Sequence, residues 1–236
     1  MNVAVMQPYF LPYIGYFQLI GAVDQFILCD SLQYSRGGWI NRNRMLMNGR
    51  ARMFTLPLRK ASGFSEISGR MIADGFDRDK LLHLFRVAYH RAPFFPGTDA
   101  LLESILRNPE QNLFRFVHAS IAAVCSHLGI ATHLRMLSDI PIGHGLKRLE
   151  RLFAVCDAVG ADAYVNAIGG MSYFSQEAFA ERGIRLSFLK PEPVAYEQSG
   201  GAFVPWLSIV DLLMFKGPEE VRELVSTGYD LVSHET

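Results

Sequence analysis

The sequence predicts an α/β protein built on a mainly parallel sheet, and three observations support this fold class. The first 30 residues contain a strand, a turn, a helix and a second strand, in that order. Strand-like and helix-like segments then alternate along most of the chain. Helical patterns between residues 77 and 129 predict an additional helical layer. Such alternation is typical of a Rossmann-like sheet with helices on both faces.

The N-terminal segment has the pattern of a βαβ unit. The short apolar run NVAVM at residues 2–6 meets Pro8 and therefore predicts a buried strand. Residues 15–23 carry apolar side chains at helical spacing, and the apolar run 24–30 predicts a second strand. Two strands joined by a crossover helix pair in parallel with a right-handed connection.

The next segment departs from simple alternation. Residues 37–49 are polar and flanked by glycines, which indicates a loop or the approach to a hairpin, and strand-like segments follow at 51–58 and 64–72. Three helices are expected after these, over residues 77–92 with Asp77 as N-cap, over 98–108 with Thr98 as N-cap, and over 112–129 with Gly129 at the C-terminal end.

The last hundred residues alternate again. Strands are expected over residues 131–140, 162–168 and 184–190, and helices over 146–160, 175–183, 206–217 and 218–227. No repeat or low-complexity linker interrupts the sequence, so we expect one domain over residues 1–236 with a helical subregion at about 77–129.

Composition and charge exclude several classes of protein. The 236 residues are 50% hydrophobic and 19% charged, which is typical of a globular chain and not of a disordered one. The 23 basic residues balance 23 acidic ones, so no broad basic surface for nucleic acid is expected. The N-terminus lacks the pattern of a signal peptide and the apolar runs are too short to cross a bilayer, so we expect a cytoplasmic protein without membrane insertion.

Cysteines and histidines give no catalytic or metal-binding pattern. Cys29, Cys125 and Cys156 are widely spaced in apolar surroundings and are expected to be buried free thiols. The histidines form neither HxH nor HExxH, so no metal site is predicted, and GxSxG is absent.

Three unusual stretches fall where a binding site is expected. In an open parallel sheet, ligands bind beyond the carboxyl ends of the strands. Residues 7–16, 30–43 and 166–170 each follow a predicted strand. The first stretch, QPYFLPYIGY, places Gln7, Tyr9 and Tyr16 around two prolines at the start of a helix, which can bind anions through free N–H groups. Alternatively, its aromatic side chains only pack against the end of the sheet and bind no ligand.

The second stretch combines amides, cations and aromatic rings. Its candidate binding residues are Asp30, Gln33, Tyr34, Trp39, Asn41, Arg42 and Asn43, with Arg36 and Arg44 beside them. Arginine beside aromatic rings suits carboxylates and phosphates, and amide side chains suit sugars. A solvated surface loop is the alternative.

Two further stretches carry polar groups. Asn166 stands at a strand end, and Gly169 and Gly170 form a turn that can present backbone amides to a phosphate or carbonyl, although a plain tight turn is equally consistent. Near the C-terminus, Gln198, Ser208 and Asp211 accompany Tyr196. Ser208 and Asp211 lack a nearby histidine and form no catalytic triad, and Asp211 can instead brace its helix against a loop.

Taken together, the motifs resemble the WbqC-like protein family over nearly the whole chain. The resemblance is carried, in order, by MQPYFLPYIGYFQLI, VDQFILCDSLQYSRGGWINRNRM, TLPL, YHRAPFF, YVNAIGG and FVPWLSIVDLLMF. It implies a connection with bacterial O-antigen gene clusters and other small-molecule pathways. The residues to which it points are Gln7, Pro8, Tyr16, Asp30, Gln33, Trp39, Asn41, Arg42, Asn43, Gly169, Gly170, Gln198, Pro205, Ser208 and Asp211. One departure is Tyr173-Phe174, where the family pattern has leucine followed by tyrosine.

These residues lead to three hypotheses about function. The first is a transferase that acts on a sugar nucleotide or an acyl or aminoacyl donor in surface-polysaccharide or related biosynthesis. In it, Asp30 is the acid or base, Arg42 holds an anion, and Gln7 orients the substrate, so the three are expected to converge on one cavity. The second hypothesis is a nucleotidyltransferase-like or adenylating enzyme with Mg²⁺ near Asp30, in which Tyr16 replaces the histidine of HIGH-type enzymes. The third is a non-catalytic binding protein. The cofactor and oligomeric state stay open.

Overall fold

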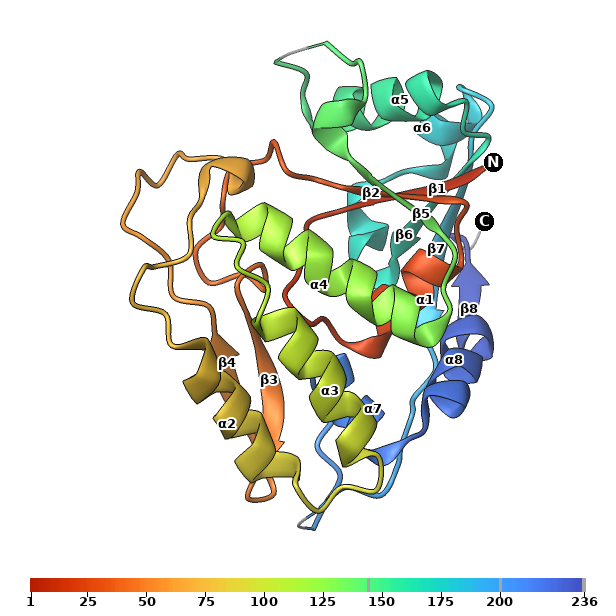
Figure 1. Ribbon diagram of the computed structural model, residues 1–236. Coiled ribbons are helices and arrows are strands. Elements are labelled where there is room, and N and C mark those ends of the chain that lie inside the picture. The colour runs from red at the N-terminus through yellow and green to blue at the C-terminus, as the bar shows by residue number, and fades with distance from the viewer. Residues whose placement is uncertain (144, 200, 235–236) are drawn as a thin grey trace.

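A six-stranded sheet forms the centre of the protein (Figure 1). The computed structural model describes residues 1–143, 145–199 and 201–234. The strands run in the order β5 (His133–Met136), β2 (Gln25–Leu28), β1 (Asn2–Met6), β6 (Ala163–Ala167), β7 (Arg185–Pro191) and β8 (Tyr229–Val232). Neighbouring strands from β5 to β7 pair in parallel, and β8 is antiparallel to β7. This confirms the mainly parallel, Rossmann-like sheet.

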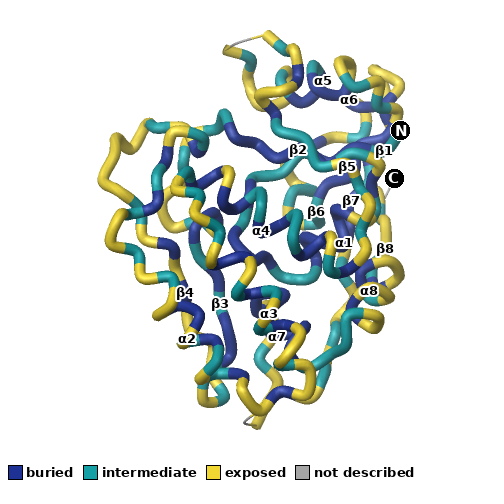
Figure 2. The backbone as a smooth tube through the Cα atoms, in the orientation of Figure 1, coloured by how far each residue is buried: buried dark blue, intermediate teal, exposed yellow. Residues whose placement is uncertain are grey.

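Helices cover both faces of the sheet, as expected. Alternate side chains of each strand point to opposite faces. Ala4 and Phe26 pack with α1 (Ile14–Gly21), α4 (Leu113–Leu128) and α8 (Pro218–Thr227) in the largest core cluster. On the other face, Tyr164 and Phe188 pack with α5 (Arg148–Val159) and α6 (Gln176–Ala180). The central strands β2 and β6 are mostly buried, whereas β8 at the edge of the sheet is intermediate or exposed (Figure 2).

Between β2 and β5 the chain forms a hairpin and the helical layer. The hairpin joins β3 (Arg42–Met47) to β4 (Arg50–Thr55) through Asn48 and Gly49, which both have positive φ, as a two-residue turn of this kind requires. The helices are α2 (Arg78–Tyr89), α3 (Phe95–Leu106) and α4. Asp77 caps α2, and Gly129 ends α4 in the left-handed conformation, both as predicted.

Three local predictions were wrong, and one strand was not predicted. Residues 64–72 form no continuous strand, because Ile67 and Ser68 donate to the carbonyls of Leu32 and Asp30. The segment contains a short 3-10 turn, η1 (Ile67–Gly69), and isolated β-bridges on either side of it. Thr98 is not an N-cap, since α3 begins at Phe95 and the Thr98 hydroxyl donates to the Leu213 carbonyl.

The other two errors lie near the C-terminus. The predicted helix 206–217 is only α7 (Ile209–Phe215), since Trp206 has a φ of 61° and Ser208 is the N-cap. The edge strand β8 was missed, because four half-exposed residues give too short a pattern to detect.

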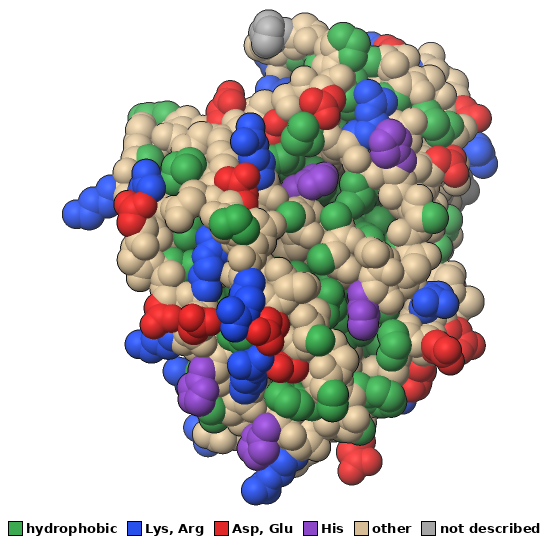
Figure 3. All heavy atoms as spheres, in the orientation of Figure 1, with side chains coloured by type: hydrophobic (Ala, Val, Ile, Leu, Met, Phe, Trp, Pro, Cys, Tyr) green, Lys and Arg blue, Asp and Glu red, His purple; other side chains and the backbone are tan. Residues whose placement is uncertain are grey.

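The three cysteines are buried free thiols, as predicted. Burial raises the pKa of the Cys29 and Cys125 thiols to about 12 and that of Cys156 to about 11, so all three stay protonated at neutral pH. Within the described ranges, no helix is long and apolar enough to cross a membrane. The face in Figure 3 intersperses basic and acidic side chains, without a broad field of one sign.

Candidate functional site

The chain changes direction between β1 and β6. From β1, the sheet grows outward through β2 and β5 on one side and through β6, β7 and β8 on the other. In open α/β sheets, such a switch point is where a crevice forms beyond the carboxyl ends of the strands. The segment that leaves β1 at this point is the proline- and tyrosine-rich stretch 7–16.

Two distant segments hold this stretch in its shape. Leu11 is buried with a φ of 44°, an unfavourable conformation for a residue with a Cβ. Its carbonyl accepts hydrogen bonds from Asn43 Nδ2 at 2.9 Å and from Ser208 Oγ at 2.7 Å. The next carbonyl, of Pro12, accepts from the Ile209 N–H at 2.8 Å. The turn is therefore fixed by the hairpin and by the start of α7.

Two adjoining hollows lie where these three segments meet. The larger, of about 260 Å³, is lined by Tyr13, Ile14, residues 191–196, Phe203, residues 205–209 and Leu212. The smaller, of about 190 Å³, is lined by Tyr9, Pro12, Tyr13, Trp39, Asn43, Arg44 and Trp206. Both contain Tyr13 and Trp206, whose ring centroids lie 5.8 Å apart. These two rings therefore form the boundary between the hollows.

The smaller hollow contains a cation with few partners. The Arg44 guanidinium lies 5.3 Å from the centre of the Trp39 ring, and one of its terminal nitrogens donates to the Trp206 carbonyl at 2.9 Å. Its Nε is buried without a hydrogen-bond partner among the described residues, and none of their carboxylates lies within 4.0 Å. A guanidinium beside an aromatic ring with an unused donor suits a carboxylate, phosphate or carbonyl oxygen.

The tyrosines of the smaller hollow supply neutral hydroxyl groups. Burial raises the pKa of Tyr9, and for Tyr13 burial and the neighbouring Tyr9 both raise the pKa. Both side chains therefore keep their protons at neutral pH and can donate hydrogen bonds.

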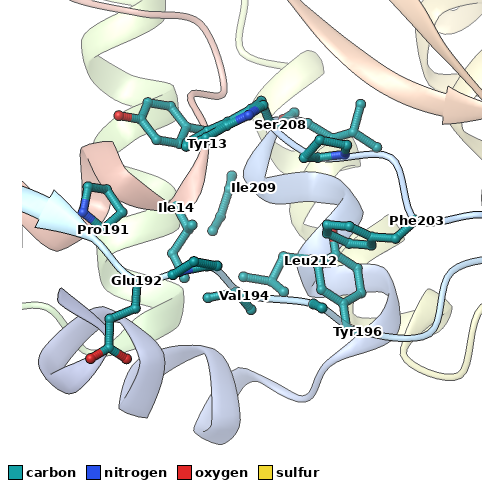
Figure 4. Close-up of a pocket in the computed structure, with 15 residues that line it drawn as sticks. Tyr13, Ile14, Pro191, Glu192, Val194, Tyr196, Phe203, Ser208, Ile209 and Leu212 are labelled. Atoms are coloured by element: carbon teal, nitrogen blue, oxygen red, sulfur yellow. The ribbon is translucent and has the colours of Figure 1, made fainter. Parts of the chain in front are cut away.

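The larger hollow is mostly apolar. In Figure 4, Ile14, Val194, Ile209 and Leu212 lie in its middle, with Tyr196 and Phe203 together at one side. The Glu192 carboxylate points away from the aliphatic side chains. Such a surface suits an acyl chain or an apolar ring.

A buried hydrogen-bond network supports the wall of this hollow. Asp211 is fully buried and accepts hydrogen bonds from the Tyr89 hydroxyl at 2.8 Å, the Tyr196 hydroxyl at 2.6 Å and Gln198 Nε2 at 2.7 Å. Gln198 Oε1 in turn accepts from the Val204 N–H at 2.8 Å. Asp211 is thus the helix-to-loop brace that the sequence left as an alternative, and it connects α2, α7 and the loop that lines the hollow.

The structure brings together only some of the predicted site residues. Tyr9, Trp39 and Asn43 line the smaller hollow and Ser208 lines the larger one. Gln198 and Asp211 support the larger hollow through Tyr196, as described above. Tyr16 is buried and its hydroxyl donates to the Gln7 carbonyl at 2.8 Å, so it positions the turn from behind.

A second group of predicted residues lies along the chain between β2 and β4. The Asp30 carboxylate accepts from the Ser138 N–H at 3.0 Å, and Gln33 donates to the Gly63 carbonyl. The Tyr34 hydroxyl donates to Asn41 Oδ1 at 2.8 Å. The Arg42 guanidinium donates to the carbonyls of Gly37 and Gly38 in its own loop. None of Gln7, Asp30 and Arg42 lines either hollow, so their convergence on one cavity stays a prediction.

The turn after β6 is organised by Asn166. Its Oδ1 accepts a hydrogen bond from the Ala167 N–H at 2.8 Å. A Cβ on Gly170 would lie 2.7 Å from Asn166 Nδ2, so this position needs glycine, whereas a Cβ on Gly169 would meet nothing within 4 Å. A binding role for these three residues also stays a prediction.

Several residues that line the hollows were not among the candidates from the sequence, and Tyr13, Glu192 and Trp206 are the polar or aromatic ones of most interest. Arg44 had been named only beside the candidate binding residues. Tyr13 and Trp206 each follow a proline, and an aromatic residue directly after proline is a signal that could have identified them. Arg44 stands beside the predicted Asn43, but in the sequence nothing distinguishes it from Arg42.

Substitution of Gly15 by alanine is expected to move the Tyr13 ring. Gly15 is the second residue of α1, and a Cβ there would lie 2.8 Å from Tyr13 Cζ. The ring can swing away, and alanine favours the helix by about 1 kcal/mol over glycine, so Gly15→Ala should fold with unchanged or slightly higher stability.

Trp206 provides the measurement for this substitution. In a Trp39→Phe background, Trp206 is the only tryptophan, and its emission should change when Tyr13 moves. The matched control is Gly97→Ala in the first turn of α3, where a Cβ meets nothing within 4 Å. Equal emission from both alanine variants would show that Tyr13 does not pack on Gly15.

Comparisons with known proteins agree with this architecture. The model of the WbqC-like protein family matches residues 7–223. An uncharacterized protein of Mycobacterium tuberculosis, Rv1507c, is 32% identical over 221 residues, which cover 92% of this chain and 95% of that protein. No solved structure matches the chain. With its family match spanning the stretch after β1, the hairpin and α7, the chain belongs to the WbqC-like protein family.

Proposed function

We propose that this protein is a transferase that moves an acyl or aminoacyl group to or from a small activated metabolite, such as a sugar nucleotide, in bacterial surface-polysaccharide or related biosynthesis. The observation that carries the proposal is an apolar hollow of about 260 Å³ that adjoins the Arg44 guanidinium. Among the described residues, Arg44 has no carboxylate partner. The apolar hollow takes the acyl part of the donor, and Arg44 takes a carboxylate, phosphate or carbonyl oxygen of the same molecule.

Position in the fold supports this assignment. Tyr9, Pro12 and Tyr13 leave β1 at the switch point of the sheet, the general location of ligands in open α/β proteins. Gln7, Asp30 and Arg42 remain the proposed catalytic residues, with Gln7 only two positions before Tyr9 in the chain.

The test is a thermal-shift screen with nucleotides, nucleotide sugars, and acyl and aminoacyl donors. An acyl or aminoacyl donor should raise the Tm, because a ligand that binds only the folded state adds roughly 2.7 kcal/mol of stability at about 100 times its Kd. Arg44→Met should lose this shift and Arg44→Lys should recover part of it. The control is Arg52→Met, an exposed arginine of the same hairpin.

Two outcomes would overturn the proposal. One is that no donor raises the Tm of the wild type while a partner protein does, as a non-catalytic binding protein would show. The other is that the donor shift is the same in Arg44→Met as in the wild type.

A nucleotidyl-transferring or adenylating enzyme is the second candidate. The strand order β5-β2-β1-β6-β7-β8, with the last strand antiparallel, favours it, because sheets wound in this order bind nucleotides at the switch point. Against it, Tyr16 is buried with its hydroxyl on the Gln7 carbonyl and cannot contact a phosphate from solvent. A Tm shift with a nucleoside triphosphate and Mg²⁺, and none with acyl donors, would select this candidate.

A further inference from the structure

Tyr34, which lies in the chain between β2 and the hairpin, has a guanidinium group over its ring and two further arginines nearby in the chain. The Arg70 guanidinium lies 4.7 Å from the centre of the Tyr34 ring. Arg42 donates to Gly37 and Gly38, the two residues after Arg36. Burial raises the pKa of Tyr34, whereas the charges of Arg70, Arg42 and Arg36 lower it. Positive charge is therefore concentrated at one place.

Among the described residues, no acidic side chain compensates this charge. None of their carboxylates lies within 4.0 Å of Arg36, Arg42 or Arg70. Arg70 is only 6% exposed, its Nε has no partner in this part of the chain, and one terminal nitrogen is 3.4 Å from the Ser62 carbonyl. A buried guanidinium without a counter-ion is strongly unfavourable, so an anion from outside the chain would satisfy it.

We propose that Arg36, Arg42 and Arg70, together with Tyr34, form a phosphate-binding site; none of these four residues lines the Arg44 hollow. Several guanidinium groups without carboxylate partners match the several oxygens and the double charge of phosphate better than a single carboxylate. The inference rests on the proposed function only for the choice of phosphate, which an activated metabolite such as a sugar nucleotide carries.

The experiment measures binding of inorganic pyrophosphate to the full chain by isothermal titration calorimetry at constant ionic strength. Arg70→Met and Arg36→Gln should each weaken binding at least tenfold. Arg185→Gln, an exposed arginine at the start of β7 and therefore at the opposite end of the sheet, is the matched control and should bind like the wild type. Arg44→Met should also bind pyrophosphate normally, because its guanidinium lines a different site.

Stability measurements separate a binding role from a structural one. Without phosphate, Arg70→Met should be as stable as the wild type or more stable, because it removes a buried charge that has no counter-ion. Pyrophosphate should then raise the Tm of the wild type and not that of Arg70→Met. If Arg70→Met fails to fold, the exposed Arg36→Gln tests binding on its own.

The site is overturned if pyrophosphate does not bind the wild type, or if Arg36→Gln and Arg70→Met bind it as tightly as Arg185→Gln does. Inorganic phosphate and a nucleoside diphosphate identify the source of the anion. Tighter binding of the nucleoside diphosphate assigns the site to a nucleotide, and equal binding assigns it to the phosphate groups alone. If pyrophosphate binds but no acyl donor raises the Tm, the phosphate site is supported and the proposed transferase function is rejected.

Discussion

Asp211→Ala should lower the free energy of unfolding by about 3–5 kcal/mol, because it leaves several buried donors without an acceptor. The wild-type carboxylate accepts from Tyr89, Tyr196 and Gln198, and all three donors are held by the surrounding structure. Tyr89 also accepts from the Leu46 N–H, so its hydroxyl cannot turn freely to another partner. Urea unfolding measures the change.

Two variants act as controls for this prediction. Asp230→Ala removes an exposed carboxylate from β8 and should change stability by less than about 0.5 kcal/mol. Asp211→Asn keeps the shape and one acceptor but turns an NH₂ group toward a donor. Its loss of unfolding free energy should therefore lie between those of Asp230→Ala and Asp211→Ala. A loss for Asp211→Ala no larger than that for Asp230→Ala would show that the network does not brace the fold.

Asp211 should also give the wild type a distinctive pH dependence. Burial raises the pKa of its carboxyl above the ordinary value of 3.8, although the three hydrogen bonds act in the opposite direction. Just above pH 3.8 the unfolded chain has therefore lost this proton while the folded protein still holds it, so stability falls as pH rises through this window.

Asp211→Asn isolates this effect, since asparagine does not titrate. The stability of the wild type relative to Asp211→Asn should be greatest near about pH 4 and should decrease toward about pH 7. Urea unfolding of both proteins at a series of pH values measures the difference. A difference that grows with pH would mean that the folded protein favours the ionised carboxylate.

Asn43→Ala is expected to produce the largest loss at the site itself. Asn43 is buried and donates to the carbonyls of Phe10 and Leu11, while its Oδ1 accepts from the Arg44 N–H at 2.8 Å. Without it, the strained Leu11 turn loses one of its two side-chain supports. We expect a loss of about 2–4 kcal/mol in unfolding free energy and of the donor-induced Tm shift.

A double-mutant cycle with Ser208→Ala tests the shared support. Both side chains donate to the same Leu11 carbonyl, so their effects should be non-additive by at least about 0.5 kcal/mol. The control pair is Asn43→Ala with Ser126→Ala, an exposed serine near the end of α4, and this pair should be additive. Additivity in both pairs would show that Asn43 and Ser208 do not hold the turn together.

Local sequence was sufficient for most of the fold. The apolar run of β1 and the helical spacing of α1 can each be recognised from a few neighbouring residues. The same holds for Asp77 as the N-cap of α2 and for Gly129 at the end of α4. The strand at 64–72 was predicted wrongly because its backbone bonds go to Asp30 and Leu32, more than thirty positions earlier in the chain. Tertiary contacts override local preference in such a segment.

The candidate site was predicted only in part, for the same reason. The stretches at 7–16 and 30–43 were identified from their composition, and Tyr9, Trp39 and Asn43 do line a hollow. Nothing in the sequence indicated that Arg44, and not Arg42, would line it, because both are arginines of one strand beside an asparagine. Their different partners depend on what the hairpin packs against.

By itself, the sequence determined the alternation of strands and helices, the start of α2, the end of α4 and the polar stretches that follow the strands, because periodicity and capping act over a few residues. Only the tertiary structure decided that Leu11 meets Asn43 and Ser208, which are 32 and 197 positions away, and that Asp211 meets Tyr89 across 122 positions. Such contacts depend on the path of the whole chain, which no short pattern specifies.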